Sequence, residues 1–406
     1  MPIDTSAQEA VLADLGRRTD EMVDVRRALH AAPELSFEEV ATTALVRERL
    51  AAARLTLEPC PTATGAVASL EGATAGPTVL LRADIDALPV HEPPGPAYAS
   101  RVEGVMHACG HDAHTAVLLG VAASLAACAD VLPGRYVFVF QPAEERVAGA
   151  RAMVDGGLLD GFDPVAALGV HVISAIPVGV VAARPGLDMA GAEALRVVAT
   201  GAGGHGSDTP RRGNLVVAVS QLADRLHTVV EGLSTEGAPC VCTPAAMHAG
   251  TAYNVVPTRA ELWTGLRWFE PEQRAEALRR LDRLMEEIAA DLAVEMTVET
   301  AMGTGPLHND PTVTAVVLDQ ARRLLPGATV SSPASPLTAS DDMSVLLDRV
   351  PGCYVKIGAG LPDRRSGAHH TPTFAIDEGA IPIAAAVLAT SAVALAAGPE
   401  RAPAPR

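Results

Sequence analysis

The sequence predicts an α/β protein with a mostly parallel sheet and a second, α+β domain inserted into the first. In the opening third, short apolar runs typical of buried strands alternate with helical patterns, which favours a parallel sheet covered by helices. From residue 193 to about 299 the order changes to strand, Gly-rich loop, long helix, two strands and a second helix, which suits a small antiparallel sandwich. After residue 303 the α/β pattern returns. We therefore expect one domain built from 1–187 and 303–406, with 188–302 inserted.

The expected elements follow from apolar periodicity, which separates helices from strands. In the first domain we expect helices at 10–32, 37–53 and about 115–129, and strands at 78–82, 135–140 and 353–358. In the inserted domain we expect strands at 194–200, 240–250 and 259–269, and helices at 215–233 and 272–292. The uncharged stretch 379–399 has about the length of a membrane span. Because it is mainly Ala and contains Pro382, we expect a C-terminal helix packed on the sheet.

Composition excludes several classes of function. The formal net charge of −17 over 406 residues argues against nucleic acid or an anionic membrane as partner. Lys356 is the only lysine, which argues against a P-loop or a Schiff-base mechanism. Six cysteines in a chain of this length are not a disulfide framework, and the first residues lack an apolar leader pattern. We therefore expect a cytoplasmic protein.

The segment MHACGHDAHTAVLLG, residues 106–120, concentrates metal-binding side chains just before a predicted helix. Thiolate and imidazole groups suit Zn²⁺ or another first-row ion. Incidental histidines at a helix start, or a Cys nucleophile with a His base, are the alternatives. So many candidate ligands at this spacing favour a metal site; they are His107, Cys109, His111, Asp112 and His114.

Adjacent Glu144 and Glu145 follow directly on an apolar strand. Ligands bind at the carboxyl edge of open α/β sheets, and neighbouring carboxylates there can divide the work between metal binding and proton transfer. Taken alone, the pair is more typical of an exposed acidic helix start. His171, inside the apolar run LGVHVIS, would by itself be read as a core histidine.

Two further motifs add candidate ligands. His369 and His370 precede Thr-Pro, and the proline favours an extended backbone before it. Asp84 and Asp86 end a predicted strand with i, i+2 spacing, so both face the same way, as ligands or as carboxylates that orient a ligating histidine. The combined set is large enough for two metal ions.

GAGGHG, residues 201–206, formally matches the GxGxxG dinucleotide fingerprint. In that fingerprint a helix opens directly after the glycines, whereas here Ser-Asp-Thr-Pro-Arg-Arg-Gly intervenes. The motif also lies in the inserted domain and not at the start of a βαβ unit. We therefore reject a nicotinamide site.

The blocks LRADIDALP, MHACGHDAHTAVLLG, FQPAEE, GVHV, GGHGS, YNVVPTRAEL and HHTPTF occur in this order along the chain. In these blocks, and over nearly its whole length, the chain resembles the M20 family of metallopeptidases and amidohydrolases. Within that family it is most similar to the branch of hippurate hydrolases and indole-acetyl-amino-acid hydrolases. The resemblance implies a zinc-exopeptidase-like catalytic domain and an inserted lid domain through which two subunits dimerise.

The resemblance also implies roles for individual residues. Glu144 would be the general base, and Asp86 an acid that supports the site from behind the ligands. In the lid domain, His205, Asn254 and Arg267 match residues that contact the scissile carbonyl and the substrate carboxylate. The two-metal site would use Cys109 as a bridging ligand, together with His111, Glu145, His171 and His370.

The chain departs from the family pattern at two places. Arg211 and Arg212 follow Pro210 where a histidine is common, and the family's SEDF block reads SDDM at 340–343. These differences leave the metal ligands intact and affect the expected substrate preference.

The sequence thus leads us to expect a di-metal amidohydrolase that cleaves an N-acyl amino acid into a carboxylic acid and a free amino acid. Two divalent ions per subunit, Zn, Mn, Co or Ni, would be its cofactors, and a homodimer its assembly, with no nucleic-acid or membrane partner. A metal-dependent dipeptidase or carboxypeptidase would share this chemistry. A catalytically silent ligand-binding homologue is the remaining alternative.

Overall fold

A computed structural model describes residues 6–207, 211–235, 237–324, 326–327, 329–362 and 366–398. The chain divides into two compact units. The first comprises Met1–Gly186, His308–Pro333 and Asp342–Arg406, and the second Leu187–Leu307 and Ala334–Asp341. Three segments that we assigned to the first domain from sequence thus belong to the second unit: Leu187, residues 303–307 and Ala334–Asp341. Pro210 and Pro399 lie outside the described residues.

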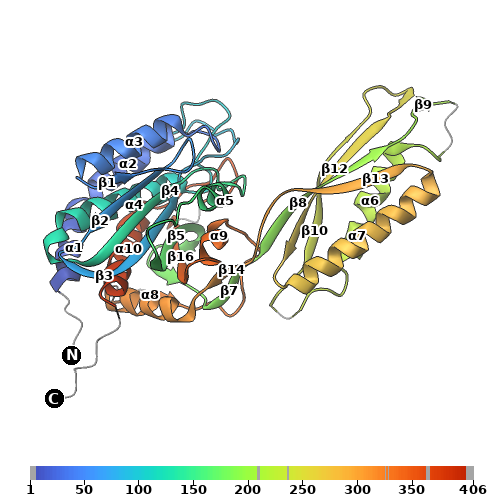
Figure 1. The fold of residues 1–406 in the computed structure, drawn as a ribbon. Coiled ribbons are helices and arrows are strands. Elements are labelled where there is room, and N and C mark those ends of the chain that lie inside the picture. Colours follow the sequence, from blue (N-terminus) through green and yellow to red (C-terminus); the bar gives the residue numbers. More distant parts are fainter. Residues whose placement is uncertain are drawn as a thin grey trace, which may run out of the picture. The chain divides into compact units, whose positions relative to one another are not determined.

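The first unit is built on an eight-stranded mixed sheet (Figure 1). Its four central strands, β4, β3, β5 and β16, are parallel, whereas the β1–β2, β2–β4 and β16–β6 pairs are antiparallel. The expected α/β class with a mostly parallel sheet is confirmed. In sheet order the strands are β1 (Thr56–Glu58), β2 (Ala66–Glu71), β4 (Pro133–Gln141), β3 (Thr74–Asp84), β5 (Pro164–Pro177), β16 (Gly352–Gly360), β6 (Val180–Ala182) and β15 (Thr329–Ser331).

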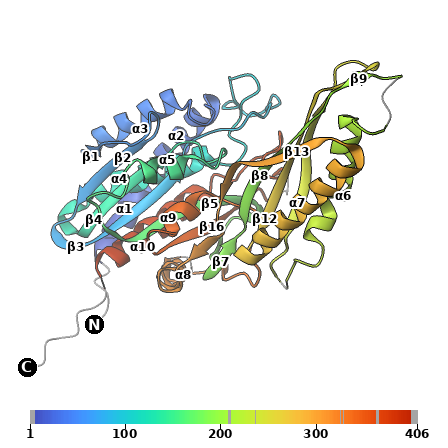
Figure 2. The same cartoon turned by 45° about the vertical axis from the view of Figure 1, so that its right-hand side comes forward.

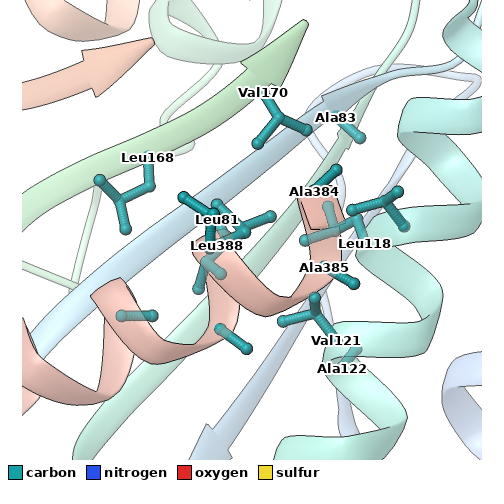
Figure 3. Packing of buried hydrophobic residues seen from close by; sticks show 14 of the residues in the cluster. Leu81, Ala83, Leu118, Val121, Ala122, Leu168, Val170, Ala384, Ala385 and Leu388 are labelled. Atoms are coloured by element: carbon teal, nitrogen blue, oxygen red, sulfur yellow. The ribbon is translucent and has the colours of Figure 1, made fainter. Parts of the chain in front are cut away.

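Helices cover both faces of this sheet. α10 packs on β3, β5 and α4, and Figure 3 shows Leu81 of β3 meeting Leu388 of α10 at this contact. Burying one such leucine contributes about 1.5–3 kcal/mol. Neighbouring residues of a strand point to opposite faces of the sheet. Arg82 follows Leu81 and therefore faces the side away from α10, where it contacts Asp342 at the start of α9. The helices of this unit are α1 (Ser6–Arg17), α2 (Thr19–Ala31), α3 (Val40–Ala52), α4 (His111–Ala127), α5 (Gly149–Asp155), α8 (Pro311–Leu324), α9 (Met343–Leu347) and α10 (Ala380–Ala396), with a 3-10 turn at Ala129–Val131.

Two expectations about helices are settled here. The uncharged C-terminal stretch forms α10, whose apolar residues are mostly buried in the core. In the part of the chain that the structure describes, none of the helices has both the length and the apolar character needed to cross a membrane. The single helix expected at 10–32 is two helices, because the backbone at Arg18 leaves the helical conformation (ψ of 1°) between α1 and α2.

The second unit is an antiparallel four-stranded sheet, in the order β10, β12, β8, β13, packed against two helices (Figure 2). Helix α7 begins at Pro271, and the side chains of Glu270 and Gln273 form a capping box there. A two-stranded ribbon, β9 with β11, carries His205. The elements are β8 (Gly191–Thr200), β9 (Gly204–His205), α6 (Leu215–Val230), β10 (Val241–Ala249), β11 (Val255–Val256), β12 (Arg259–Trp268), α7 (Pro271–Leu292) and β13 (Glu295–Thr304). β7 (Gly186–Met189) and β14 (Leu307–Asn309) lie at the first two of the four crossings of the chain between units.

The single lysine lies inside the first unit. Lys356 is on the central strand β16 and is only 4% exposed. Its Nζ donates to the carbonyl oxygen of Tyr354 at 3.2 Å. Burial lowers the pKa of this ammonium group to about 7.

Candidate metal centre

The predicted ligands of the first unit converge where the central strands end. Parallel strands present their carboxyl ends at one edge of the sheet, and ligands bind at that edge in open α/β folds. Asp84 ends β3, Glu144 and Glu145 follow β4, and His171 lies in the second half of β5. Cys109 and His111 stand at the start of α4, and His369 and His370 lie on the loop after β16.

The turn that presents Cys109 and His111 depends on Gly110. This residue has a φ of +92°, in the left-handed region that side chains disfavour. A Cβ atom added there would collide with the Cγ2 atom of Val172. Gly110 therefore allows the cysteine loop to lie directly against β5, which carries His171.

The rings of His111 and His171 are held in the same way. His111 Nδ1 donates to the backbone carbonyl oxygen of Asp86 at 3.0 Å, and His171 Nδ1 donates to that of Val172 at 2.8 Å. A carbonyl oxygen only accepts hydrogen bonds, so each neutral ring carries its proton on Nδ1 and a lone pair on Nε2. His171 Nε2 lies 3.6 Å from Cys109 Sγ. Both imidazoles thus turn a metal-binding nitrogen towards the cysteine.

Buried atoms in this cluster fit a metal site. Among the described residues, His111 Nε2 and Glu145 Oε1 are buried without a hydrogen-bond partner, and they lie 3.8 Å apart. Burial raises the pKa of the Cys109 thiol well above its usual value and also raises that of Glu145. A bound divalent cation would reverse both effects, because it deprotonates a coordinating thiol and pairs with a buried carboxylate.

The predicted metal ligands fall into two groups that share one atom. Cys109, His111 and His171 form one group, and Cys109, Glu145 and His370 form the other, with the ligand atoms of each group within 4.8 Å of one another. His370 Nε2 lies 3.4 Å from Glu145 Oε2, and the backbone of His370 has a φ of +64°. The structure therefore brings all five predicted ligands together.

Asp86 supports the candidate ligands through hydrogen bonds. Its carboxylate accepts hydrogen bonds from the backbone N–H groups of Glu144 (3.1 Å) and Glu145 (3.0 Å) and from Ser36 Oγ (2.6 Å). One oxygen also lies 3.2 Å from His111 Nδ1. Burial alone would raise the pKa of Asp86, but the hydrogen bond with His111 and the other donors lower it. Asp86 thus fixes both the histidine ring and the turn that carries the two glutamates.

Asp84 belongs to a second buried network. Its carboxylate contacts His114 Nδ1 at 2.6 Å and Arg82 Nη1 at 2.8 Å. Arg82 Nη2 also donates to Asp342 at 2.9 Å. Asp342 is the third residue of the SDDM block, where the family's SEDF block also has Asp, so the departures on either side of it leave a carboxylate on Arg82. The i, i+2 spacing of Arg82 and Asp84 is visible in the sequence, whereas the contact with Asp342 is not.

A third network anchors the start of α4. Asp112, next to His111, contacts His30 Nδ1 and Arg26 Nε, each at 2.8 Å. Burial would raise the pKa of Asp112, but these two partners lower it far below its usual range. Sequence reasoning placed Asp112 in the metal-loop motif but did not find Arg26 or His30 as its partners.

Removing the carboxylate of Asp342 is expected to destabilise the first unit. Asp342→Ala would take from the buried Arg82 one of its acidic partners, and breaking a buried pair costs about 3–5 kcal/mol in the free energy of unfolding. Urea denaturation of the metal-free protein measures this cost. The matched control is Asp319→Ala, which removes an exposed partner of Arg323 and should change the free energy by about 1 kcal/mol or less. Equal effects of the two substitutions would contradict a structural role for the buried pair.

The other predicted residues belong to the second unit. His205 and Asn254 are neighbours on the β9–β11 ribbon, where Gly206 N–H donates to the carbonyl oxygen of Asn254 at 2.9 Å. Both are exposed. Arg267 lies near the far end of β12, where Nη1 donates to Ser340 Oγ. The structure thus brings His205 and Asn254 together and separates Arg267 from them.

The chain matches the model of peptidase family M20/M25/M40 over residues 80–394. The protein belongs to this family. It is 36% identical to N-acetyl-L-cysteine deacetylase of Bacillus subtilis, over 93% of this chain and 88% of that one. It is 32% identical to thermostable carboxypeptidase 2 of Saccharolobus solfataricus, over 95% of this chain and 98% of that one.

Among solved structures, the M20 protein resembles the Bacillus subtilis YXEP protein, described as a dinuclear metal-binding peptidase of the M20 family. The TM-score is 0.77 with 31% identity, and the match covers 94% of this chain and 99% of that one. The family, the fold and the enzyme class expected from the sequence, a metal-dependent hydrolase, are therefore confirmed.

Proposed function

We propose that this M20 enzyme uses two divalent ions to hydrolyse N-acyl amino acids to a carboxylic acid and a free amino acid. The observation that carries the proposal is that Cys109 is the one residue common to the two groups that together contain all five predicted ligands. One thiolate shared in this way can join two cations. His111 and His171 would complete one side, and Glu145 and His370 the other. Thiolate, imidazole and carboxylate ligands together suit Zn, Mn, Co or Ni.

The two adjacent glutamates take different parts in this proposal. Glu145 lies within 3.4 Å of His370 and belongs to the group that contains Cys109, which supports a role as ligand. Glu144 is 3.9 Å from His111 Nε2, and we assign it as the general base. Asp86 takes part indirectly, since it orients His111 and fixes the peptide groups of both glutamates.

The reaction follows from this arrangement. Bound divalent ions supply Lewis acidity, which polarises the amide carbonyl and makes water a better nucleophile. Glu144 accepts a proton as the water oxygen forms its bond to the acyl carbon. When the C–N bond breaks, Glu144 returns that proton to the leaving nitrogen. The products are the carboxylic acid and the free amino acid.

His205 is suited to stabilise the oxyanion that develops on the carbonyl. The backbone N–H of Ser207 donates to His205 Nδ1 at 3.2 Å, so the neutral ring carries its proton on Nε2. The exposed ring therefore offers an N–H donor, as oxyanion stabilisation requires. Asn254, beside it, offers an amide donor to the substrate.

The positions of His205 and Arg267 support a homodimer. β12 runs extended from Arg259 to Trp268, and Arg259 pairs with Thr200, just before the His205 ribbon. At about 3.3 Å per residue, Arg267 is roughly 26 Å from the Arg259 end. A small N-acyl amino acid cannot bridge this distance. If both residues bind one substrate, two subunits must contribute to each site, and we infer a dimer formed through the inserted unit.

Mixing two inactive variants is expected to restore activity. In a heterodimer of His205→Ala and Glu144→Gln chains, a shared-site enzyme regains one site with both groups intact. Activity should then return towards half of the wild-type value per heterodimer. The measurement is turnover after subunit exchange, with exchange followed by fluorescence energy transfer between labelled chains. Background activity despite complete exchange would show that each site is built within one chain.

The test of the function is a hydrolysis screen on demetallated enzyme supplied with Mn²⁺, Zn²⁺ or Co²⁺. N-acetyl, N-benzoyl and indole-acetyl amino acids form one panel, and dipeptides the other. Because one relative is a carboxypeptidase, peptide hydrolysis is the second candidate, and preferential cleavage of dipeptides would favour it. No hydrolysis of either panel would point to a silent homologue. A cytoplasmic location remains part of the proposal.

A further inference from the structure

His369, the neighbour of the proposed ligand His370, also contacts the shared cysteine. Its Nδ1 lies 3.6 Å from Cys109 Sγ. The backbone N–H of Ser174 donates to its Nε2 at 3.3 Å. The ring packs against Phe374, with 4.9 Å between ring centroids. Both nitrogens and one side of the ring are therefore held in place.

These contacts determine which atom His369 presents to the sulfur. A backbone N–H can only donate, so Nε2 must accept and carries no proton. The ring is then neutral, and its one proton is on Nδ1, the atom that faces Cys109. At His111 and His171 the Nδ1 proton points instead to a backbone carbonyl, and the Nε2 lone pair faces the cluster. His369 thus offers a donor where those rings offer a ligand atom.

The same arrangement occurs a second time nearby. His114 Nε2 accepts from the backbone N–H of Val172 at 2.9 Å, and its Nδ1 lies 2.6 Å from the Asp84 carboxylate. Strand β5 stays paired with β16 over its later part but pairs with β3 only as far as Gly169, so later N–H groups on the β3 side can bind side chains. Val172 and Ser174, two residues apart, each hold one imidazole whose Nδ1 proton points to an acceptor. For His114 this acceptor is a carboxylate. For His369 it is Cys109, through its sulfur at 3.6 Å and through a backbone hydrogen bond of the same residue.

We propose that His369 is a positioning residue that donates a hydrogen bond from Nδ1 to the Cys109 thiolate and does not itself bind metal. The proposal rests on the proposed role of Cys109 as a shared ligand. A donor to a coordinating sulfur fixes its direction and draws electron density from it, which leaves the ions more electrophilic. Because the hydrogen bond also orients the sulfur, we expect its loss to weaken metal binding, and removing an orienting partner of a ligand typically costs about 10–100-fold in metal affinity.

Two variants separate the hydrogen bond from the bulk of the ring. His369→Phe keeps a planar ring against Phe374 but has no donor. His369→Asn is smaller, but its amide nitrogen can stand where Nδ1 stood. His91→Phe, at an exposed site, is the matched control for a His→Phe change. Thermal unfolding of the metal-free variants shows whether each one folds.

The measurements are metal affinity, by competition with a chromophoric chelator, and the thiolate-to-cobalt charge-transfer band of the Co²⁺ protein. We expect His369→Phe to bind metal about 10–100-fold more weakly, with both ions still bound at saturation, and to shift the band to lower energy. His369→Asn should restore most of both properties. In the wild-type protein, long-range ¹H–¹⁵N spectra should place the His369 proton on Nδ1, a measurement that needs no variant.

Four other outcomes would contradict the proposed role of His369 or of Cys109. Loss of one ion at saturation in His369→Phe would make His369 a ligand. An unchanged band and affinity in His369→Phe, or equal losses in the Phe and Asn variants, would make its role purely structural. A proton on Nε2 would contradict the proposed hydrogen bond directly. Absence of any thiolate band in the wild-type Co²⁺ protein would instead refute the proposed role of Cys109.

Discussion

Replacing Glu144 with glutamine is expected to lower kcat by about 10²–10⁴-fold while both divalent ions stay bound. Glutamine keeps the size of the side chain but cannot take a proton from water. The proposed ligands do not include Glu144, so the metal content should not change. Turnover and metal content by mass spectrometry, measured on the same preparation, test both parts of the expectation.

Glu145→Gln is the matched control, because it makes the same chemical change one residue away. The neutral amide replaces a carboxylate that faces His370 and shares a ligand group with Cys109, so this variant should lose an ion. If Glu144→Gln lost an ion while Glu145→Gln kept both, the two roles would be reversed.

Cys109→Ala is expected to lose both ions and all measurable activity. The sulfur belongs to both ligand groups, so its removal weakens both metal positions at once. No single substitution among the other four proposed ligands touches both groups. Equilibrium metal content after dialysis, compared with the wild-type protein, measures the effect. Cys60→Ala, which removes a half-buried thiol beside Thr62, should leave metal content and activity unchanged.

Demetallation distinguishes a cysteine ligand from a cysteine nucleophile. A chelator should abolish wild-type activity, and an added divalent ion should restore it. If activity survived complete removal of metal but was lost on thiol alkylation, Cys109 would act as a nucleophile, and the proposed mechanism would be wrong.

The sequence carried enough information to expect the candidate ligands at one site, because several of them occupy special places in local patterns and the family resemblance supplied the rest. Cys109 and His111 sit at a helix start, and the two glutamates follow an apolar strand. Since parallel strands end at one edge of a sheet, these separate motifs could be expected to meet there. His171 was ambiguous in isolation, since a buried histidine in a strand is more often part of a core.

The proposed division of labour between His369 and His370 could not be predicted in the same way. It depends on the backbone N–H of Ser174, which becomes available only because β5 extends beyond its pairing with β3. The contact of Arg82 with Asp342 likewise joins residues 260 positions apart in the chain. Such contacts follow from tertiary packing, and the local hydrophobic periodicity of the sequence does not predict them.

The buried position of Lys356 has a practical consequence for labelling this protein. Amine-reactive dyes, biotin reagents and crosslinkers attach to accessible lysine side chains and to the α-amino group of a chain, and the only lysine of this chain is 4% exposed inside the sheet. Crosslinking between lysine side chains would therefore not identify the residues of a subunit interface in the folded protein. A lysine introduced at an exposed arginine, such as Arg283 on α7, would become the one accessible lysine side chain and a defined point for attaching a surface or a probe.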